Sequence, residues 1–385
     1  MHILIVPSWY TSSQNPIRGS FFRDQALALH HHGHQVGMLV PPSRFRTFNG
    51  LREFIANWHK RSTDISISND EGIMTYRMPW WGWLPSVMPQ LRGNLFLRLF
   101  DEYCVNHGVP DILHGHSILY GGYLAAYIGQ RRKIASLVTE HSSLFLTSGY
   151  QLGHQPFIRY TLSHVDKVLA VGESLVRALQ VYNPHINVDI IGNVVDTNLF
   201  VPPSTLPPPV PFIISIFGRL DHNKAQNLLL QAFAQALKGK DAQLHIVGDG
   251  QMRKQYERLC SQLALGSQVT FFGQLPREAV IRMMQESHVV VSSSTIETFG
   301  VTLIEAMACG KPVIATRSGG PEYFIDDSDG LLVPSGDVES LAQAMLTMYV
   351  QHSQYDAQDI RARCIARFSE EAIAQQLETL YEELR

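Results

Sequence analysis

The sequence predicts an α/β protein of two doubly wound domains that face each other across a cleft. Three observations support this fold class. Short apolar runs alternate with longer helical stretches, a proline-rich segment interrupts the alternation near the middle, and the 385-residue chain is longer than one hydrophobic core usually serves. Such alternation is typical of parallel strands joined by crossover helices, whose ligands gather where the strands end. Both domains are therefore expected to present binding loops to the cleft.

Short runs rich in Ile, Leu and Val are predicted strands in the first half, because their length and composition match buried strands. They lie at residues 3–6, 36–40, 112–114, 134–139, 168–171 and 188–191. Longer stretches with apolar residues at helical spacing are predicted helices, at residues 21–31, 95–106, 119–129 and 174–180. These elements define an N-terminal domain over residues 1–200.

The segment VPPSTLPPPVP, residues 201–211, is predicted to be a stiff linker. Its prolines cannot continue a helix or a central strand, because proline lacks the N–H that both require. A second domain is predicted over residues 212–368. The chain then ends in a helix, residues 369–385, that is expected to pack back on the N-terminal domain.

The second domain repeats the alternation of the first. Its predicted strands are residues 213–217, 244–247, 269–272, 289–292, 313–315 and 330–333. Its predicted helices are residues 225–237, 252–263, 277–286, a short helix through Glu305, and residues 338–350, followed by the final helix at 370–384.

Composition narrows the class of protein. With 45% hydrophobic and 17% charged residues, the chain is typical of a folded globular protein. No apolar run reaches the roughly eighteen residues of a membrane span, and the apolar N-terminus is interpreted as a strand rather than a signal peptide. Four scattered cysteines without a C-x-x-C pair suit a reducing cytoplasm. The first half is mildly basic, too weakly to predict nucleic-acid binding.

The most informative stretch is SSSTIETFGVTLIEAMACGKPVIATRSGGPEYF, residues 292–324. A strand ends near Ser292, and a helix is predicted to open near Gly300 and to close at Gly310. The amides at its start are expected to be unpaired beside the positive end of the helix dipole, which suits a diphosphate or sugar hydroxyls. These amides belong to Phe299, Gly300, Val301, Thr302 and Leu303.

Two glutamates flank that helix start. Glu297 lies in the loop before the helix and Glu305 lies within it, and a carboxylate can hold sugar or ribose hydroxyls by charge-assisted hydrogen bonds. Taken singly, Glu297 has a plainer interpretation as an acidic residue at a helix N-terminus, and Glu305 has one as a residue on a solvated helix face. Glu305 is nevertheless surrounded by the apolar and small residues of LIEAMACG, where an unpaired carboxylate is costly.

These residues resemble the E-x7-E signature of glycosyltransferase family 4, a family of retaining sugar transferases with the GT-B fold of two Rossmann-like domains. The similarity continues through GGPE (319–322), DGLLVPSGD (329–337), GRLDHNK (218–224), IVGDGQMR (246–253) and VTFFGQL (269–275). It covers nearly the whole C-terminal domain in the family's order and spacing.

The resemblance implies roles for single residues. Glu305 would bind the donor's ribose, Glu297 the transferred sugar, and the helix amides sugar and phosphate. Gly218 ends the first strand of the domain, and Arg219 and Lys224 follow it as cations suited to the departing diphosphate. From these residues alone, two solvated surface cations are an equal alternative. The family usually has Lys-Gly where this chain has Lys224-Ala225, which leaves the local turn open.

The N-terminal domain offers fewer candidates. Gly19 is predicted at the entrance of the first helix, where family members commonly have a glycine-rich loop near donor phosphate and acceptor. Arg18-Gly19 replaces the common glycine pair. His141 matches the family histidine near the reacting face of the donor sugar, and His116 ends the preceding strand. A lone strand-end histidine can equally be structural.

Three other features have plainer interpretations. The tract His30-His31-His32-Gly33-His34 resembles a metal site but is expected to be a helix end without a completing carboxylate cluster. Residues 326–329 are interpreted as a polar turn before a strand. The stretch WWGWLPSVMP, residues 80–89, is interpreted as part of the core. The more specific alternative is an exposed apolar cap for a lipid-linked acceptor, or an anchor at the membrane interface.

The resemblance implies a cytoplasmic, metal-independent, retaining hexosyl or N-acetylhexosaminyl transferase with a UDP- or GDP-linked donor. No cofactor is expected, because the Gly248-Asp-Gly250 turn lacks the third glycine of a dinucleotide fingerprint. PSWY and GSFFRDQA resemble family members that build surface polysaccharides on a polyprenyl diphosphate carrier, which predicts a lipid-linked saccharide acceptor and peripheral membrane contact through the N-terminal domain. The alternatives are a non-catalytic nucleotide-sugar-binding protein and another GT-B enzyme such as an epimerase.

Overall fold

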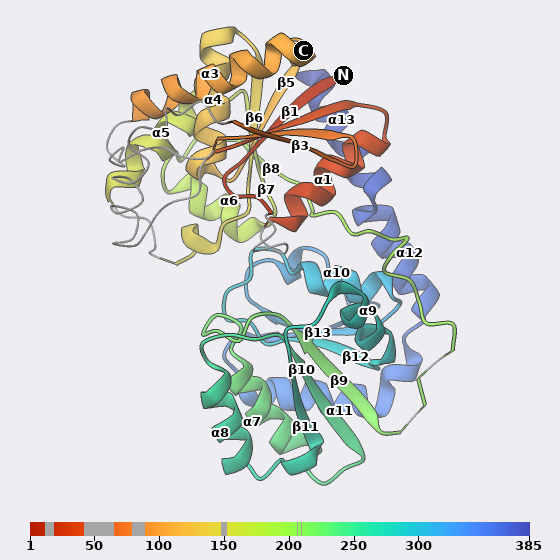
Figure 1. Cartoon of the computed structure of the whole chain (residues 1–385). Helices are drawn as coiled ribbons and strands as arrows, with labels where there is room; N and C mark the ends of the chain where they lie inside the picture. The colour runs from red at the N-terminus through yellow and green to blue at the C-terminus, as the bar shows by residue number, and fades with distance from the viewer. Residues whose placement is uncertain (12–18, 42–64, 79–88, 148–151, 206, 209) are drawn as a thin grey trace. The chain divides into compact units, whose positions relative to one another are not determined.

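The protein forms two compact units in a computed structural model (Figure 1). The structure describes residues 1–11, 19–41, 65–78, 89–147, 152–205, 207–208 and 210–385. The first unit comprises Met1–Val171, Leu175–Val194 and Ile373–Arg385, and the second comprises Gly172–Ser174 and Val195–Ala372. Residues 201–211, predicted as a linker, belong to the second unit in this division.

The first unit is built on an eight-stranded sheet of order β3-β4-β2-β1-β5-β6-β7-β8. All neighbouring strands are parallel except β3, which pairs antiparallel with β4. The strands are β1 (His2–Pro7), β2 (Gln35–Val40), β3 (Ser66–Asp70), β4 (Ile73–Arg77), β5 (Ile112–His116), β6 (Ala135–Glu140), β7 (Lys167–Ala170) and β8 (Val188–Ile190).

Helices cover both faces of this sheet (Figure 1). They are α1 (Ser20–His31), α3 (Pro89–His107), α4 (Tyr123–Arg132), α5 (Gln155–His164), α6 (Glu173–Gln180) and α13 (Glu370–Glu383). Leu4 and Leu113 pack with side chains of α3, α4 and α5 on one face. Because side chains alternate along a strand, His114 points to the other face, where its Nδ1 lies 2.7 Å from the Tyr381 hydroxyl of α13.

The second unit has a six-stranded, fully parallel sheet of order β11-β10-β9-β12-β13-β14. Its strands are β9 (Phe212–Phe217), β10 (Ala242–Val247), β11 (Val269–Gly273), β12 (Val289–Ser292), β13 (Val313–Arg317) and β14 (Gly330–Pro334). Its helices are α7 (Gln226–Leu237), α8 (Arg253–Gln262), α9 (Arg277–Glu286), α10 (Val301–Ala308), α11 (Val338–Gln351) and α12 (Ala357–Phe368).

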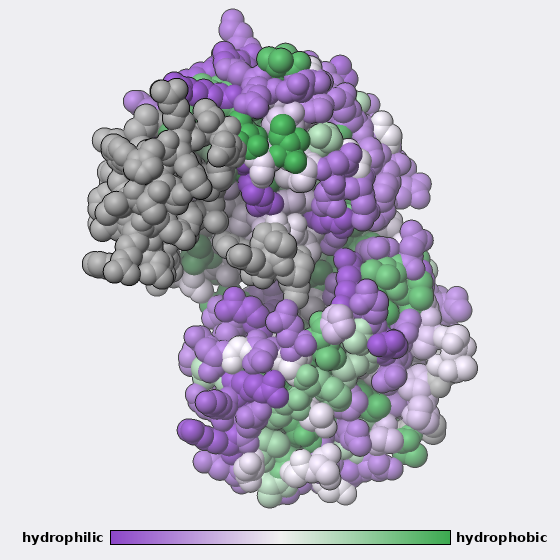
Figure 2. All heavy atoms as spheres, viewed as in Figure 1, coloured by the Kyte–Doolittle hydropathy of each residue, from purple (hydrophilic) through white to green (hydrophobic). Residues whose placement is uncertain are grey.

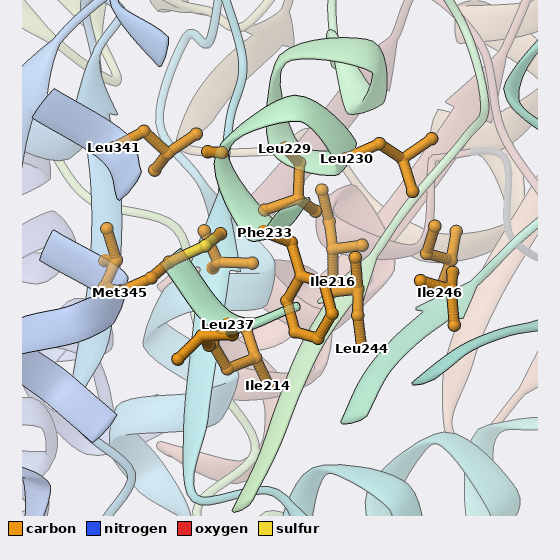
Figure 3. Packing of buried hydrophobic residues seen from close by; sticks show 14 of the residues in the cluster. Ile214, Ile216, Leu229, Leu230, Phe233, Leu237, Leu244, Ile246, Leu341 and Met345 are labelled. Carbon is orange, nitrogen blue, oxygen red and sulfur yellow. The ribbon is translucent and has the colours of Figure 1, made fainter. Parts of the chain in front are cut away.

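The core of the second unit lies between this sheet and α7, α8 and α11. Figure 3 shows Leu229, Phe233 and Leu237 of α7 over the strand residues of β9 and β10, with Leu341 and Met345 of α11 beside them. Burial of each such side chain contributes about 1.5–3 kcal/mol to folding. The core therefore holds the sheet rigid and leaves the loops at its ends to carry ligand contacts.

Most predicted elements are confirmed, and the exceptions have local causes. The β3–β4 hairpin was not predicted, because β3 is almost entirely exposed and lacks an apolar run. Its turn uses Glu71 and Gly72, both with positive φ, which is the backbone geometry of a tight hairpin. Helices α5 and α12 were also not predicted. The predicted helix at 119–129 is wrong at its start, since a short helical turn, Ile118–Gly122, precedes α4.

Hydrophilic residues cover much of the visible surface, with hydrophobic residues interspersed (Figure 2). Within the described ranges, no helix is long and apolar enough to cross a membrane. Of the tryptophan stretch at 80–89, only Pro89, the first residue of α3, lies within the described residues. All four cysteines are described and carry free thiols.

Candidate active site

The candidate site of the second unit lies where its strand order reverses. From β9 the chain runs outward to β10 and β11, and then returns to β12 on the other side of β9. The loops after β9 and β12 therefore leave the same edge of the sheet in opposite directions. Ligands of open α/β sheets bind at this switch point. It is also where the predicted residues Gly218, Arg219, Lys224 and Glu297 lie.

Hydrogen bonds tie three neighbouring loops together at this edge. The Thr295 amide donates to the Asn223 carbonyl at 2.7 Å, and the Ser293 hydroxyl donates to the Lys224 carbonyl at 2.9 Å. The Glu297 amide donates to the carbonyl of Ser318, just after β13, at 3.0 Å. These bonds join loops far apart in sequence, so the functional side chains they carry are held on a common framework.

Lys224 and Glu297 form an ion pair, in which the Lys224 ammonium donates to Glu297 Oε2. Both side chains are largely buried, with 27% and 15% of their surface exposed. Arg219 is 80% exposed, and its Nε lies 3.5 Å from Asp221 Oδ2. The site thus combines one oriented ammonium with one guanidinium that is free to turn toward an anion.

The turn that carries Lys224 is strained. Ala225 caps the start of α7 in a left-handed conformation, with φ 48° and ψ 42°. That conformation costs a residue with a Cβ about 1–2 kcal/mol relative to glycine. A glycine at this position would adopt the same conformation without that cost.

Helix α10 begins at the same edge. Gly300 is its N-cap, with φ 109°, a value that favours glycine. Val301 and Thr302 are the first helical residues, whose amides have no partner within the helix. The prediction that the Leu303 amide is unpaired is wrong, because the tight first turn directs it to the Gly300 carbonyl at 2.9 Å.

The side chains around that helix start divide into buried and half-exposed groups. The Phe299 ring is 1% exposed and packs on Phe324 and Phe368. A Cβ on Gly320 would lie 2.4 Å from the Phe299 nitrogen, so only glycine fits beside that amide. Glu305 is half-buried, although its neighbours Ile304 and Ala306 are fully buried. Its carboxylate therefore lies at the border of the core rather than inside it.

Two glycines bring the strand ends close together. A Cβ on Gly248, which has φ 135°, would lie 1.9 Å from the Gly218 carbonyl oxygen. The Gly218 amide in turn donates to the Val247 carbonyl at 2.9 Å. This close approach of the two backbones explains why glycine occupies position 248.

Replacing Gly248 with alanine is expected to destabilise the second unit by about 3 kcal/mol and to displace Arg219, since the methyl group must push away the Gly218 backbone. Gly239→Ala is the matched control, because Gly239 also has a positive φ, 75°, with no atom within 4 Å of an added Cβ. Its cost should be about 1 kcal/mol. Denaturant unfolding measures both, and equal losses would contradict the close approach.

The first unit has an equivalent switch point between β1 and β5. Gly19 lies there as the N-cap of α1 with φ 79°, and its carbonyl accepts the Phe22 amide at 3.1 Å. The Ser8 hydroxyl donates to the Ser117 carbonyl and accepts the Gly121 amide, both at 2.8 Å. These bonds join the loops after β1 and β5.

His141 follows β6 at the same edge and is only 8% exposed. The rings of Phe21 and Phe22 lie against it, each with a centroid 5.1 Å away. Burial lowers the pKa of His141 to about 3, so the ring is neutral at physiological pH. A direct contact with a sugar is limited to the small part of this residue that is exposed.

Glu140 holds the backbone around His141 and was not predicted. Its Oε1 accepts the amides of His141 at 2.9 Å and Ser142 at 2.6 Å, and its Oε2 accepts the Ile118 amide at 2.8 Å. Burial raises the pKa of this carboxyl to about 7, although the three amides favour the charged form. An acidic residue directly before the histidine was the only sequence signal for this role.

Two other motifs lie where the sequence predicts them, as a turn before β14 and as the end of α1. Asp326 organises a polar turn into β14, accepting the Ser328 amide at 3.0 Å. In the histidine tract, His32 and His34 approach Glu378 of α13, with nitrogen–oxygen distances of 3.2 and 3.6 Å. Across the described ranges, no group of three or more His, Cys, Asp and Glu side chains suits a metal ion.

Comparison with known proteins identifies the family. Residues 19–199 match the model described as "Glycosyltransferase Family 4", and residues 201–364 match "Glycosyl transferases group 1". N-acetyl-alpha-D-glucosaminyl L-malate synthase of Bacillus anthracis is 29% identical over 286 residues, which cover 70% of this chain and 74% of that protein. The lipopolysaccharide core biosynthesis glycosyltransferase LpsE of Rhizobium meliloti is 32% identical over 170 residues, covering 43% and 48% of the two chains.

Solved structures share the fold over the whole chain. Sucrose-phosphate synthase of Thermosynechococcus elongatus superposes with a TM-score of 0.78 at 23% identity, covering 100% of this chain and 99% of that one. Anabaena HepE, solved in complex with UDP, gives 0.72 at 19% identity and covers 100% of both. With both family models matched along the chain and this fold, the protein belongs to the family 4 type of GT-B glycosyltransferases.

Proposed function

We propose that this glycosyltransferase moves a hexosyl or N-acetylhexosaminyl group from a UDP- or GDP-linked donor to a saccharide acceptor, with retention of anomeric configuration and without a metal ion. The observation that carries the proposal is the group of Lys224, Glu297 and Arg219 beside the start of α10, at the switch point of the second unit. Cations and helix amides suit a diphosphate, and carboxylates suit sugar hydroxyls.

In the proposed reaction, the bond between the donor's anomeric carbon and the β-phosphate oxygen breaks. A bond from the acceptor hydroxyl oxygen to that carbon forms on the same face, and the hydroxyl proton passes to the departing phosphate. Negative charge grows on the diphosphate as the bond breaks, so Arg219, Lys224 and the amides of Val301 and Thr302 would stabilise the transition state more than the ground state. These cations would neutralise the charge of the diphosphate, as a bound metal ion does in other enzymes.

Two carboxylates would each bind a different part of the donor. Glu305, half-buried on α10, would hold the ribose hydroxyls, and Glu297 would hold hydroxyls of the transferred sugar. The ion pair with Lys224 supports this division, because it fixes one oxygen of Glu297 and leaves the other for a ligand. Gly19 and His141, which follow β1 and β6, stay the predicted functional residues of the first unit.

The acceptor is proposed to be a saccharide carried on polyprenyl diphosphate in surface polysaccharide biosynthesis. The resemblance of PSWY and GSFFRDQA to transferases of that pathway supports this, as does the relative named for lipopolysaccharide core biosynthesis. Work at a carrier lipid would place the protein at the inner face of the cytoplasmic membrane. A preference for water-soluble acceptors, with no binding to anionic vesicles, would overturn this part of the proposal.

The test is a screen of UDP- and GDP-linked sugars against the purified chain, with thermal stabilisation and release of free nucleotide as readouts. One donor at 100 times its Kd should stabilise the protein by about 2.7 kcal/mol and be hydrolysed slowly without acceptor. Stabilisation with no hydrolysis or transfer would favour the non-catalytic binding protein. No stabilisation by any donor would overturn the assignment of the site.

A further inference from the structure

Asp221 contacts both cations of the candidate site in the second unit, and the proposed function gives it no role. Its Oδ1 accepts the backbone amide of Lys224 at 3.1 Å, and its Oδ2 lies 3.5 Å from Arg219 Nε. The Asp221 side chain is 20% exposed, so the carboxylate lies largely within the loop after β9. A negative charge beside two cations that are proposed to bind an anion opposes that ligand, because like charges close together cost free energy. The two carboxylate oxygens therefore have different consequences for the ligand.

Oδ1 of Asp221 shapes the turn that presents Lys224. A side-chain oxygen that accepts the amide three residues later is a common way to hold such a turn, and Asp and Asn both provide it. The turn leads directly into Ala225, whose left-handed conformation is costly, so this bond helps to hold Lys224 in place. Because the bond requires only an acceptor oxygen, an asparagine at position 221 would retain it.

The main chain around Asp221 is held by bonds of its own. Gln226 is 1% exposed, and its Nε2 donates to the Arg219 carbonyl at 2.9 Å. The Asp221 amide donates to the same carbonyl at 3.1 Å, and the hydroxyl of the buried Tyr256 donates to the Asp221 carbonyl at 3.0 Å. These bonds do not involve the Asp221 carboxylate. Removing its charge should therefore leave the path of the loop unchanged.

The two cations of the site are balanced by two carboxylates. Lys224 pairs with Glu297, and Arg219 pairs with Asp221. A diphosphate that binds Arg219 must compete with the Asp221 carboxylate, because both are anions that accept from the same guanidinium. The Arg219 side chain is 80% exposed, so it can exchange one partner for the other without uncovering buried surface. The charge of Asp221 therefore lowers the affinity of the site for a diphosphate.

We propose that Asp221 positions Lys224 through one carboxylate oxygen and, by competing for Arg219 with the other, keeps the affinity of the site for the nucleoside diphosphate low. The inference rests on the proposed function, in which Arg219 and Lys224 bind that diphosphate. A transferase releases the nucleoside diphosphate after every transfer, and variants of one site differ in affinity mainly through their dissociation rates. A carboxylate that takes Arg219 back therefore shortens the time for which the product occupies the site.

The test is calorimetric titration of wild type and two Asp221 variants with UDP, GDP and inorganic pyrophosphate. Asp221→Asn keeps the bond to the Lys224 amide and removes the charge, so Kd for the diphosphate should fall by about 5-fold. Asp221→Ala removes the charge and the bond together, so Kd should stay near the wild-type value or rise above it. A residue with only a structural role would give no gain in affinity in either variant.

Asp241→Asn is the matched control. It removes the same charge from an exposed residue directly before β10, at the opposite edge of the sheet from the candidate site. Its Kd for the diphosphate should stay within about 2-fold of wild type, because solvent and salt screen a distant exposed charge.

A double variant tests whether Arg219 is the group for which Asp221 competes. Arg219→Ala removes the contested guanidinium, so adding Asp221→Asn to it should change Kd by less than about 2-fold. A gain in affinity that persists in full without Arg219 would overturn the proposal. Dissociation of a fluorescent nucleoside diphosphate should also be about 5-fold slower from Asp221→Asn than from wild type.

Binding by Asp221→Asn that is no tighter than binding by wild type, at equal thermal stability, would also contradict the proposal. If that variant does not fold, Asp221→Ser replaces it, because an uncharged hydroxyl can accept the Lys224 amide. If wild type binds neither UDP, GDP nor pyrophosphate, the assignment of Arg219 and Lys224 to a diphosphate is wrong, and the proposed function and this inference both fail. If a diphosphate binds more tightly to Asp221→Asn but wild type transfers no sugar, the transferase fails and the role of Asp221 stands.

Discussion

Replacing Glu305 with alanine is expected to weaken binding of the nucleotide-sugar donor by on the order of 10²-fold. The carboxylate lies on α10, beyond a helix start whose amides are proposed to bind the diphosphate, and it is half-buried at the border of the core. Charge-assisted hydrogen bonds to two ribose hydroxyls contribute about 1.5–3 kcal/mol each, so their loss is large. Calorimetric titration with the donor identified in the screen measures the change.

A second titration, with the nucleoside diphosphate product in place of the donor, makes this test specific. A carboxylate that holds the ribose acts on the part of the donor that the diphosphate product retains. Glu305→Ala should therefore weaken donor and product by the same factor. Glu297→Gln is the matched variant: it should weaken the donor and leave the product nearly unchanged, because Glu297 is assigned to the transferred sugar. Equal effects of the two variants on the product would contradict the division of roles.

The parts of the fold that were predictable are those in which local sequence and packing agree. β9 and β12 are nearly continuous apolar runs because both faces of a parallel sheet are covered, and α10 has a glycine at each end. In the β3–β4 hairpin, local sequence and packing do not agree in this way. Its outer strand, Ser66–Asp70, is polar and exposed, so no apolar periodicity marks it.

The candidate site was predictable in composition but not in its connections. The motif placed Lys224 and Glu297 in the same domain, yet their ion pair depends on β9 and β12 being neighbours, which follows from the strand order and not from any local pattern. The same holds for His116 and His141, which come together because β5 and β6 are adjacent. Ala225 is the opposite case, in which the local sequence was informative. It stands where the resembled family usually has glycine, and the structure has a strained turn there.

Replacing Lys224 with alanine is expected to lower kcat by 10²–10³-fold, with a smaller effect on donor binding. An ammonium aimed at a departing diphosphate is worth most in the transition state, where the negative charge is greatest, and loss of one preorganised donor typically costs about 2.7–4 kcal/mol. Steady-state kinetics with the identified donor gives kcat and KM separately. Lys240→Ala is the control, because Lys240 is an exposed lysine of the same unit outside the candidate site.

The double variant Lys224→Met/Glu297→Gln separates catalysis from structural support. Lys224→Ala alone also leaves the Glu297 carboxylate without its partner and close to an anionic ligand, which costs free energy irrespective of any role in the reaction. The double variant removes both charges and keeps both volumes. If Lys224 serves only to neutralise Glu297, the double variant should be no slower than Glu297→Gln alone. If it stabilises the leaving group, the rate should stay at least 10²-fold below that of Glu297→Gln, because nothing in the double variant replaces that positive charge.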